Sequence, residues 1–120
     1  MQFVVTPSSL HGQVVIPGSK SHTIRALVCA LLADGTSTIQ MPLDSSDTRS
    51  CLSMIRQFGA TVEEHEHEWV VKSNGAPQLP DDVIDVGNSG TSLYFGIGVA
   101  SLIPGMTVFT GDHQIRNRPA

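Results

Sequence analysis

A repeat within the sequence constrains the fold of this chain more than any other feature does. When the 120-residue sequence is shifted by seventy positions against itself, similar residues coincide without a gap: Ile16 with Val86, Ser19 with Ser89, Ala30 with Ala100, Leu32 with Leu102 and Gly35 with Gly105. Such a repeat indicates one supersecondary unit used more than once, in which neighbouring units cover each other's apolar faces. Chance similarity between two strand–helix turns is the alternative.

The first unit is predicted from changes in the hydrophobic period. Extended segments are expected at residues 2–6 and 13–16, and a helix from near Ser19 to residues 34–35, because apolar residues recur there at helical spacing. Gly35 is the expected C-terminal cap of this helix. A strand at 36–41, a second helix capped by Ser46 or Asp47 and ending before Gly59, and a hairpin of residues 60–64 and 69–72 complete the order βαβαββ.

The second half begins the same order again, with a strand at residues 83–86, a helix at 90–103 and a strand at 107–110. The counterpart of the second helix would begin near Arg116, four residues before Ala120. We therefore expect an α/β fold with one complete unit over residues 13–74 and an incomplete second unit over residues 75–120, in a sequence cut from a longer protein.

Composition excludes several classes of function. Seven lysines and arginines stand against eleven aspartates and glutamates, and this net charge of −4 gives little support for binding nucleic acid. No apolar run approaches the roughly 20 residues of a membrane span, and no signal peptide opens the chain, so a cytoplasmic protein is expected. Cys29 and Cys51 show no CxxC spacing and are predicted to be reduced, buried thiols.

Both repeats place a turn rich in glycine and serine before a helix, at residues 17–21 (PGSKS) and 87–91 (GNSGT). The amides of a helix N-terminus and the positive end of its dipole favour a small anion there. Lys20 adds a charge, Ser21 a hydroxyl, and Arg25 follows one helical turn later on the face of Ser21. The doubled turn therefore predicts an anion-binding cleft, and a capped helix with solvated Lys and Arg is the alternative.

Two other chemistries are disfavoured by spacing. Residues 18–21 (GSKS) look like the end of a P-loop, but Ser19 separates Gly18 from Lys20, so an NTPase is not expected. His65 and His67 could share one strand face and chelate a metal, but no third ligand stands at a recognisable spacing. We expect a solvated hairpin tip there and no metal site.

The last motif follows a strand and spans residues 111–119 (GDHQIRNRP), in which Arg116 and Arg118 could close over an anion. Together, four motifs resemble the N-terminal part of the 3-phosphoshikimate 1-carboxyvinyltransferase (EPSP synthase) family, in its order and at its spacings. They are residues 17–21 with Arg25, residues 44–49 (DSSDTR), residues 87–91, and residues 111–112 with 116–119. The resemblance covers nearly the whole chain.

This resemblance implies a fold of the α+β prism type, in which each of two domains holds three βαβαββ units and residues 1–12 give the first strand to the other domain. It implies transfer of the enolpyruvyl group of phosphoenolpyruvate to the 5-hydroxyl of shikimate 3-phosphate, with no metal or organic cofactor. Lys20, the backbone N–H of Gly90 and Arg118 would hold phosphoenolpyruvate. Ser21 and Arg25 would hold shikimate 3-phosphate, and Thr91 would lie beside the ring.

The resemblance also implies what the chain lacks. The family's acid and base carboxylates follow residue 120, so catalytic residues remain unidentified and the chain alone is expected to be inactive without the remainder of the polypeptide. The family usually has Met-Arg-Pro where this chain has residues 93–95 (LYF), and Asp47 is expected to be a helix cap beside Arg49. A UDP-N-acetylglucosamine enolpyruvyl transferase and a noncatalytic anion-binding module of the same fold are the alternatives.

Overall fold

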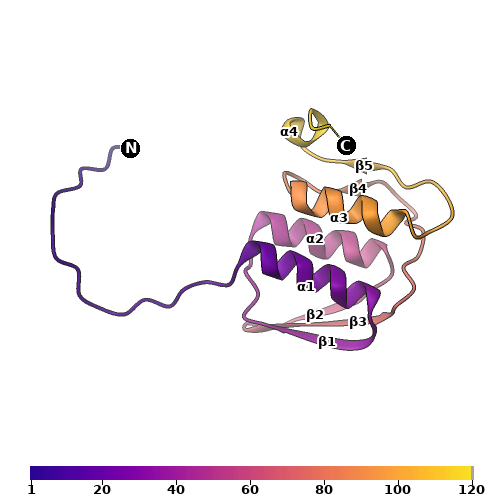
Figure 1. The fold of residues 1–120 in the computed structure, drawn as a ribbon, viewed down its shortest axis with the longest axis horizontal. Helices are drawn as coiled ribbons and strands as arrows, with labels where there is room; N and C mark the ends of the chain where they lie inside the picture. Colours follow the sequence, from indigo (N-terminus) through magenta and orange to yellow (C-terminus); the bar gives the residue numbers. More distant parts are fainter. Residues whose placement is uncertain (120) are drawn as a thin grey trace.

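A layer of three helices lies between two small β-sheets in the computed structural model, which describes residues 1–119 (Figure 1). The elements in chain order are α1 Lys20–Leu32, β1 Asp34–Gln40, α2 Ser46–Gln57, β2 Thr61–Glu64, β3 Glu68–Asn74, β4 Ile84–Asp85, α3 Gly90–Ala100, β5 Phe109–Thr110 and α4 His113–Arg116. Helices and strands are mixed along the chain, which confirms the predicted α/β class.

The larger sheet is antiparallel, with strand order β1-β3-β2, so that β1 and β2 are its edges. Its central strand alternates, and Trp69 and Val71 point into the core while Lys72 is exposed. The smaller sheet pairs β4 with β5 in parallel, Ile84 opposite Phe109. This confirms the expected hairpin of the first unit and the strand–helix–strand order of the second.

The core lies where the helices meet the larger sheet. The apolar stripe predicted for α1 is confirmed at Ile24, Leu27 and Leu31, which are completely buried, but Leu32 at the end of the helix is 39% exposed. Cys51 is buried as predicted, whereas the prediction for Cys29 is wrong. Because neighbouring helical residues point about 100° apart, Cys29 falls outside the buried stripe and faces solvent.

Serine caps begin all three long helices. The hydroxyl of Ser19 accepts the N–H of His22, and the hydroxyl of Ser89 accepts the N–H of Ser92, so the repeat extends to the caps. The cap of α2 is Ser45, not Ser46 or Asp47 as predicted, because Ser45 and Thr48 form a reciprocal capping box.

The end of α1 also differs from the prediction, because Ala33 and not Gly35 is its C-terminal cap. Gly35 lies in β1 with φ of 114°, and Gly105, its counterpart in the repeat, has φ of 134°. Both values fall in the region that favours glycine. The glycines of the repeat therefore share a backbone conformation.

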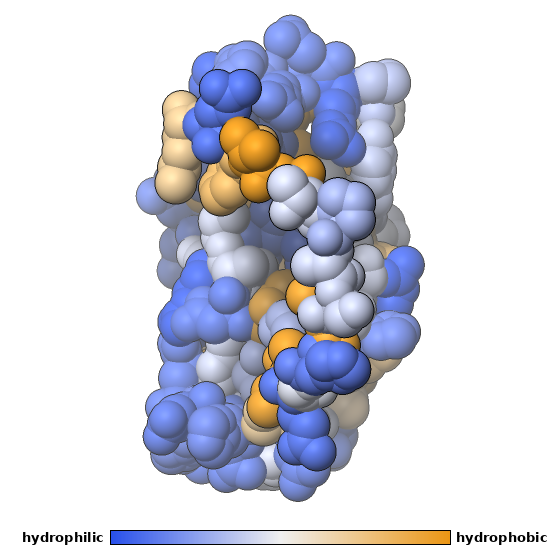
Figure 2. Space-filling view, turned by 90° about the vertical axis from the view of Figure 1, so that its left-hand side faces the viewer, coloured by the Kyte–Doolittle hydropathy of each residue, from blue (hydrophilic) through white to orange (hydrophobic). Residues whose placement is uncertain are grey.

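Residues 1–17 run away from the folded part as an extended segment (Figure 1), and the strands expected at residues 2–6 and 13–16 are not formed. A strand requires a hydrogen-bonding neighbour, and none of residues 1–119 pairs with them. Their apolar side chains are exposed, among them Phe3 at 80% and Val15 at 88%. Figure 2, which views the side from which this segment extends, shows hydrophobic residues on the surface among polar ones.

No helix among residues 1–119 combines the length and apolar character that crossing a membrane requires.

Candidate functional site

The N-terminal ends of α1, α2 and α3 lie at the same edge of the helical layer, as the course of the chain in Figure 1 shows. Each end exposes backbone amides that have no partner within their helix, and the dipoles of the helices add positive potential there. The two turns rich in glycine and serine, which begin α1 and α3, are thus brought to one edge. Binding of an anion between these two turns stays a prediction from the sequence.

Lys20 is the first residue of α1 and forms an ion pair with α2. Its Nζ lies 2.7 Å from Oδ2 of Asp47, and the side chains are 50% and 20% exposed. The expected contact of Asp47 with Arg49 is therefore wrong. Arg49 bonds to Asp44 and Glu64 instead, and its guanidinium lies 5.6 Å from the centre of the Trp69 ring.

Arg25 lies one turn after Ser21 on the same face, as predicted, and its Nη1 donates to the backbone oxygen of Ser21 at 3.1 Å. Its guanidinium lies 5.4 Å from the centre of the Phe95 ring on α3. Among the ion pairs within residues 1–119, none includes Arg25 or Arg118. These two exposed cations are therefore available to an anion.

The second turn packs against the motif of residues 111–119. The N–H of Asp112 donates to the oxygen of Gly87 at 2.8 Å, and the carboxylate of Asp112 caps α4. Arg118 reaches Gly90 so closely that a Cβ added there would lie 2.5 Å from Nη1 and 3.1 Å from Cζ. The structure therefore brings Arg118 to the amide end of α3, where Thr91 is half-buried.

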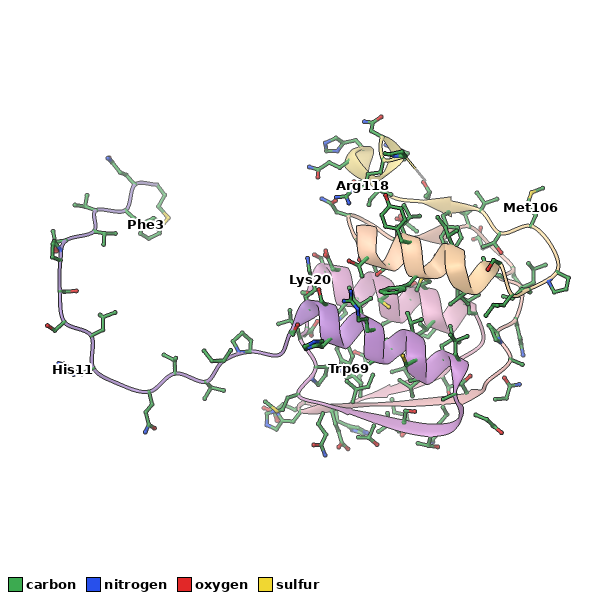
Figure 3. All side chains as sticks on the ribbon, in the orientation of Figure 1. Phe3, His11, Lys20, Trp69, Met106 and Arg118 are labelled. Carbon is green, nitrogen blue, oxygen red and sulfur yellow. The ribbon has the colours of Figure 1, made fainter. Side chains whose placement is uncertain are left out.

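Arg118 also borders an open hollow of about 380 Å³ that lies between α3, β5 and α4. Its charged lining residues are Arg116 and Arg118. The other lining residues are mostly apolar: Leu93, Ile97, Phe109, Thr110 and Ile115. Figure 3 shows Arg118 beside the start of α3 and Lys20 at the start of α1.

Two carboxylates that bond to Arg49 are held in their ionised forms by arginines. The Arg49 guanidinium lowers the pKa of Asp44, and hydrogen bonds from Arg56 and then Arg49 lower the pKa of Glu64. Arg49 is therefore neutralised by its own neighbours and is not available to a ligand.

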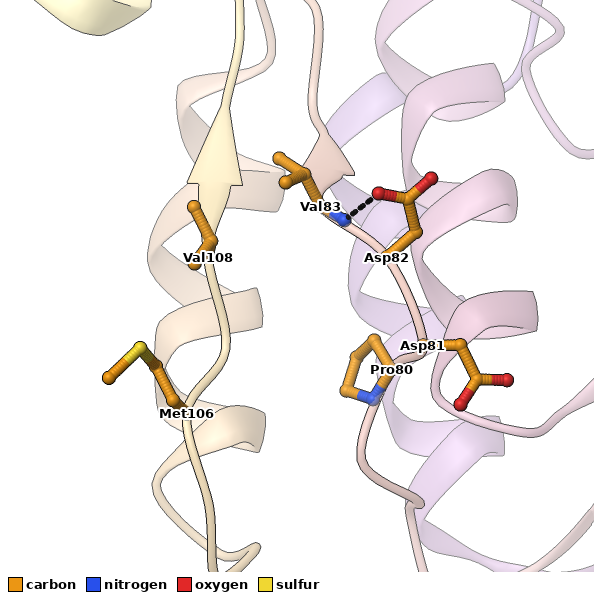
Figure 4. Close-up of a pocket in the computed structure, with 6 residues that line it drawn as sticks. All are labelled: Pro80, Asp81, Asp82, Val83, Met106 and Val108. Atoms are coloured by element: carbon orange, nitrogen blue, oxygen red, sulfur yellow. Dashed lines mark hydrogen bonds between the residues drawn. The ribbon is translucent and has the colours of Figure 1, made fainter.

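A second hollow lies away from this edge, between residues 80–83 and the segment that contains Met106 and Val108 (Figure 4). It has a volume of about 240 Å³, and the only charged side chains that line it are the carboxylates of Asp81 and Asp82. A site with two carboxylates and no cation repels anions. Within residues 1–119 no three His, Cys, Asp or Glu side chains are grouped so that they could hold a metal ion.

Sequence reasoning missed two partners of the candidate residues. Tyr94 donates its hydroxyl to the oxygen of Pro119 at 3.0 Å, and Phe95 supplies the ring over Arg25. Both contacts join residues far apart in the sequence, and no local pattern indicates them.

Comparison with known proteins gives consistent matches. Residues 4–120 match the family model described as EPSP synthase (3-phosphoshikimate 1-carboxyvinyltransferase). A 3-phosphoshikimate 1-carboxyvinyltransferase of Acetivibrio thermocellus is 53% identical over 120 residues, which are 99% of this chain and 28% of that protein. One from Ruminiclostridium cellulolyticum is 54% identical over 115 residues, 95% of this chain and 27% of that protein.

Among solved structures, EPSP synthase from Acinetobacter baumannii matches with a TM-score of 0.83 and 29% identity, over 90% of this chain and 25% of that one. The chain thus spans little more than a quarter of the length of the curated relatives named above.

Proposed function

Since this chain belongs to the EPSP synthase family, we propose that it supplies one wall of an active site that transfers the enolpyruvyl group of phosphoenolpyruvate to the 5-hydroxyl of shikimate 3-phosphate. The observation that carries this proposal is the gathering of three helix N-termini with Lys20, Arg25 and Arg118 at one edge. Both substrates carry phosphate and carboxylate groups, and such an edge offsets their mutual repulsion.

The proposed roles follow the geometry of the two turns. Lys20, the backbone N–H of Gly90 and Arg118 would hold phosphoenolpyruvate. Arg25 donates a hydrogen bond to the backbone oxygen of Ser21. These two residues would hold shikimate 3-phosphate, and Thr91 would border its ring. An arginine fork suits the oxygens of phosphate or carboxylate, and amides at a helix start suit a phosphate.

In this reaction the 5-hydroxyl gives up its proton to a base as its oxygen forms a bond to C2 of phosphoenolpyruvate, and C3 takes up a proton from an acid, which gives a tetrahedral intermediate. Loss of phosphate and of a proton from C3 then restores the double bond. The cations described above would orient the two substrates and stabilise the departing phosphate. We propose that the acid and base carboxylates come from the part of the family's proteins that this chain does not span.

The parallel pairing of β4 and β5 suggests where residues 13–16 belong. Ile84 pairs with Phe109. In the seventy-residue repeat, these two residues correspond to Val14 and Ile39. β1, which contains Ile39, is an edge strand, and a hollow of about 330 Å³ lies beside its end. We propose that residues 13–16 add to this edge as a parallel strand and complete a unit over residues 13–74.

The remaining parts of the organisation are proposals on the same basis. Residues 1–12 would join the other domain, residues 75–120 would begin the second unit, and the protein would act in the cytoplasm with the two substrates and no nucleic acid. The reaction as proposed uses no metal or organic cofactor.

The test is a titration of the ¹⁵N-labelled chain with shikimate 3-phosphate and with phosphoenolpyruvate, followed by NMR. Shifts are expected in the amides of residues 19–25 with the first ligand and of residues 89–91 with the second, at about millimolar Kd for a partial site. In Gly90→Ala the new Cβ displaces Arg118, so phosphoenolpyruvate should bind about tenfold more weakly and shikimate 3-phosphate almost normally.

Gly98→Ala is the matched control, because a Cβ at Gly98 meets no atom within 4 Å. A phosphate-release assay with both substrates should show no turnover by the chain alone. Absence of shifts at these turns, or shifts elsewhere only, would contradict the assignment of the site.

A further inference from the structure

Two adjacent aromatic residues of α3 contact the two arginine-bearing segments of the candidate site. Tyr94 donates its hydroxyl to the oxygen of Pro119, the residue after Arg118, at 3.0 Å. Phe95 lies 5.4 Å from the guanidinium carbon of Arg25. Because adjacent helical side chains point about 100° apart, one turn of α3 reaches both segments at once.

The contact of Phe95 fixes the side chain of Arg25 from a second direction. A cation within about 6 Å of a ring centre is attracted by the ring, and the half-buried Phe95 ring is held by the core. Arg25 also donates to the Ser21 oxygen. A long arginine side chain held at both points loses less conformational freedom when an anion binds.

The contact of Tyr94 fixes the backbone on which Arg118 stands. The N–H of Arg118 donates to the oxygen of Ile115 at 3.0 Å, and Tyr94 holds the next residue. The ring of Pro119 restricts the backbone of the residue before it. Arg118 is thereby held from both sides, with its guanidinium against Gly90.

We propose that Tyr94 and Phe95 are positioning residues that hold Arg118 and Arg25 in place for the two anionic substrates. Each acts on one arginine, so each governs one ligand: Tyr94 governs phosphoenolpyruvate and Phe95 governs shikimate 3-phosphate. This assignment of ligands rests on the proposed function. That Tyr94 and Phe95 restrict the motion of the two arginines does not rest on it.

The test compares Tyr94→Phe and Phe95→Leu with the unchanged 120-residue chain, and with Leu102→Ala as a control at a 65% exposed position. Tyr94→Phe removes only the hydroxyl, and with it the hydrogen bond to the Pro119 oxygen. The backbone order parameter of Arg118 should therefore fall from about 0.85 towards about 0.6. In Phe95→Leu the upfield ring-current shift of the Arg25 side-chain protons should disappear. The circular dichroism spectrum should stay unchanged in both variants. Core amide shifts should stay unchanged in Tyr94→Phe, and in Phe95→Leu they should change only beside the lost ring, which packs against the core.

Titrations with the two ligands then separate positioning from general damage. Tyr94→Phe should weaken phosphoenolpyruvate about three- to tenfold and leave shikimate 3-phosphate unchanged, and Phe95→Leu should do the reverse. Equal weakening of both ligands in each variant, or an unchanged order parameter at Arg118, would overturn the proposal. If the unchanged chain binds neither ligand, the proposed function fails. The order parameter of Arg118 and the ring-current shift of the Arg25 protons then decide alone whether Tyr94 and Phe95 position the two arginines.

Discussion

Replacement of Gly96 by alanine is expected to destabilise the chain, although alanine favours a helix. Gly96 lies in α3 at the point where this helix meets α2 and β5. A Cβ added there would lie 2.6 Å from Sδ of Met54 and 2.7 Å from Cε1 of Phe109, closer than side chains approach. Met54 is completely buried and cannot move into solvent.

The magnitude follows from two opposing effects. Forcing an extra carbon into a packed core costs about 1–3 kcal/mol. Replacing glycine by alanine within a helix gains about 0.8–1.0 kcal/mol. Gly96→Ala should therefore lose between about zero and 2 kcal/mol of the free energy of unfolding.

Gly98→Ala isolates the packing effect, because this residue lies in the same helix and its new Cβ would meet no atom within 4 Å. It should gain about 1 kcal/mol. Urea unfolding followed by circular dichroism measures both variants, and their unfolding free energies should differ by about 1–3 kcal/mol. Equal stability of the two would refute the close approach of α2 and β5 to Gly96.

The remaining predictions concern buried polar atoms. Burial raises the pKa of the Cys51 thiol to about 12, so iodoacetamide should modify exposed Cys29 alone at neutral pH, as mass spectrometry would show. The unfolded thiol ionises at lower pH than the folded one, so Cys51 should make stability fall between about pH 9 and 12; a Cys51→Ala variant should lose this component. Thr48→Val removes a hydroxyl that donates to the Leu43 oxygen at 2.7 Å and accepts the Ser45 N–H, and should cost about 1–3 kcal/mol in thermal unfolding.

The elements that were predictable from the sequence are those with local signals. The periodic residues of α1 and the serine caps at Ser19 and Ser89 indicate where the helices lie and begin, because capping and periodicity depend on neighbours a few residues away. The cap of α2 was predicted one or two residues late, since residues 45–47 (SSD) are all good caps and only the pairing of Ser45 with Thr48 selects one.

Other features depended on contacts that no local pattern carries. Strands need partners, and the β-branched residues among 13–16 could not reveal that this segment lacks a partner among residues 1–119. The placement of Ser21 and Arg25 on one helical face followed from their spacing alone. The partners Asp47 and Phe95 come from other helices, and their positions depend on how α1, α2 and α3 pack.

The ion pair between Lys20 and Asp47 makes anion binding at this lysine an exchange. The ammonium group already has a carboxylate at 2.7 Å, so an incoming ligand must displace Asp47 or share the lysine with it. A singly charged carboxylate would replace one carboxylate by another, with little net change in free energy. A phosphate dianion brings a second charge that Asp47 lacks. At the anion site that we propose, the pair would therefore favour dianions over monoanions, and Asp47 would influence which ligands Lys20 binds without contacting them.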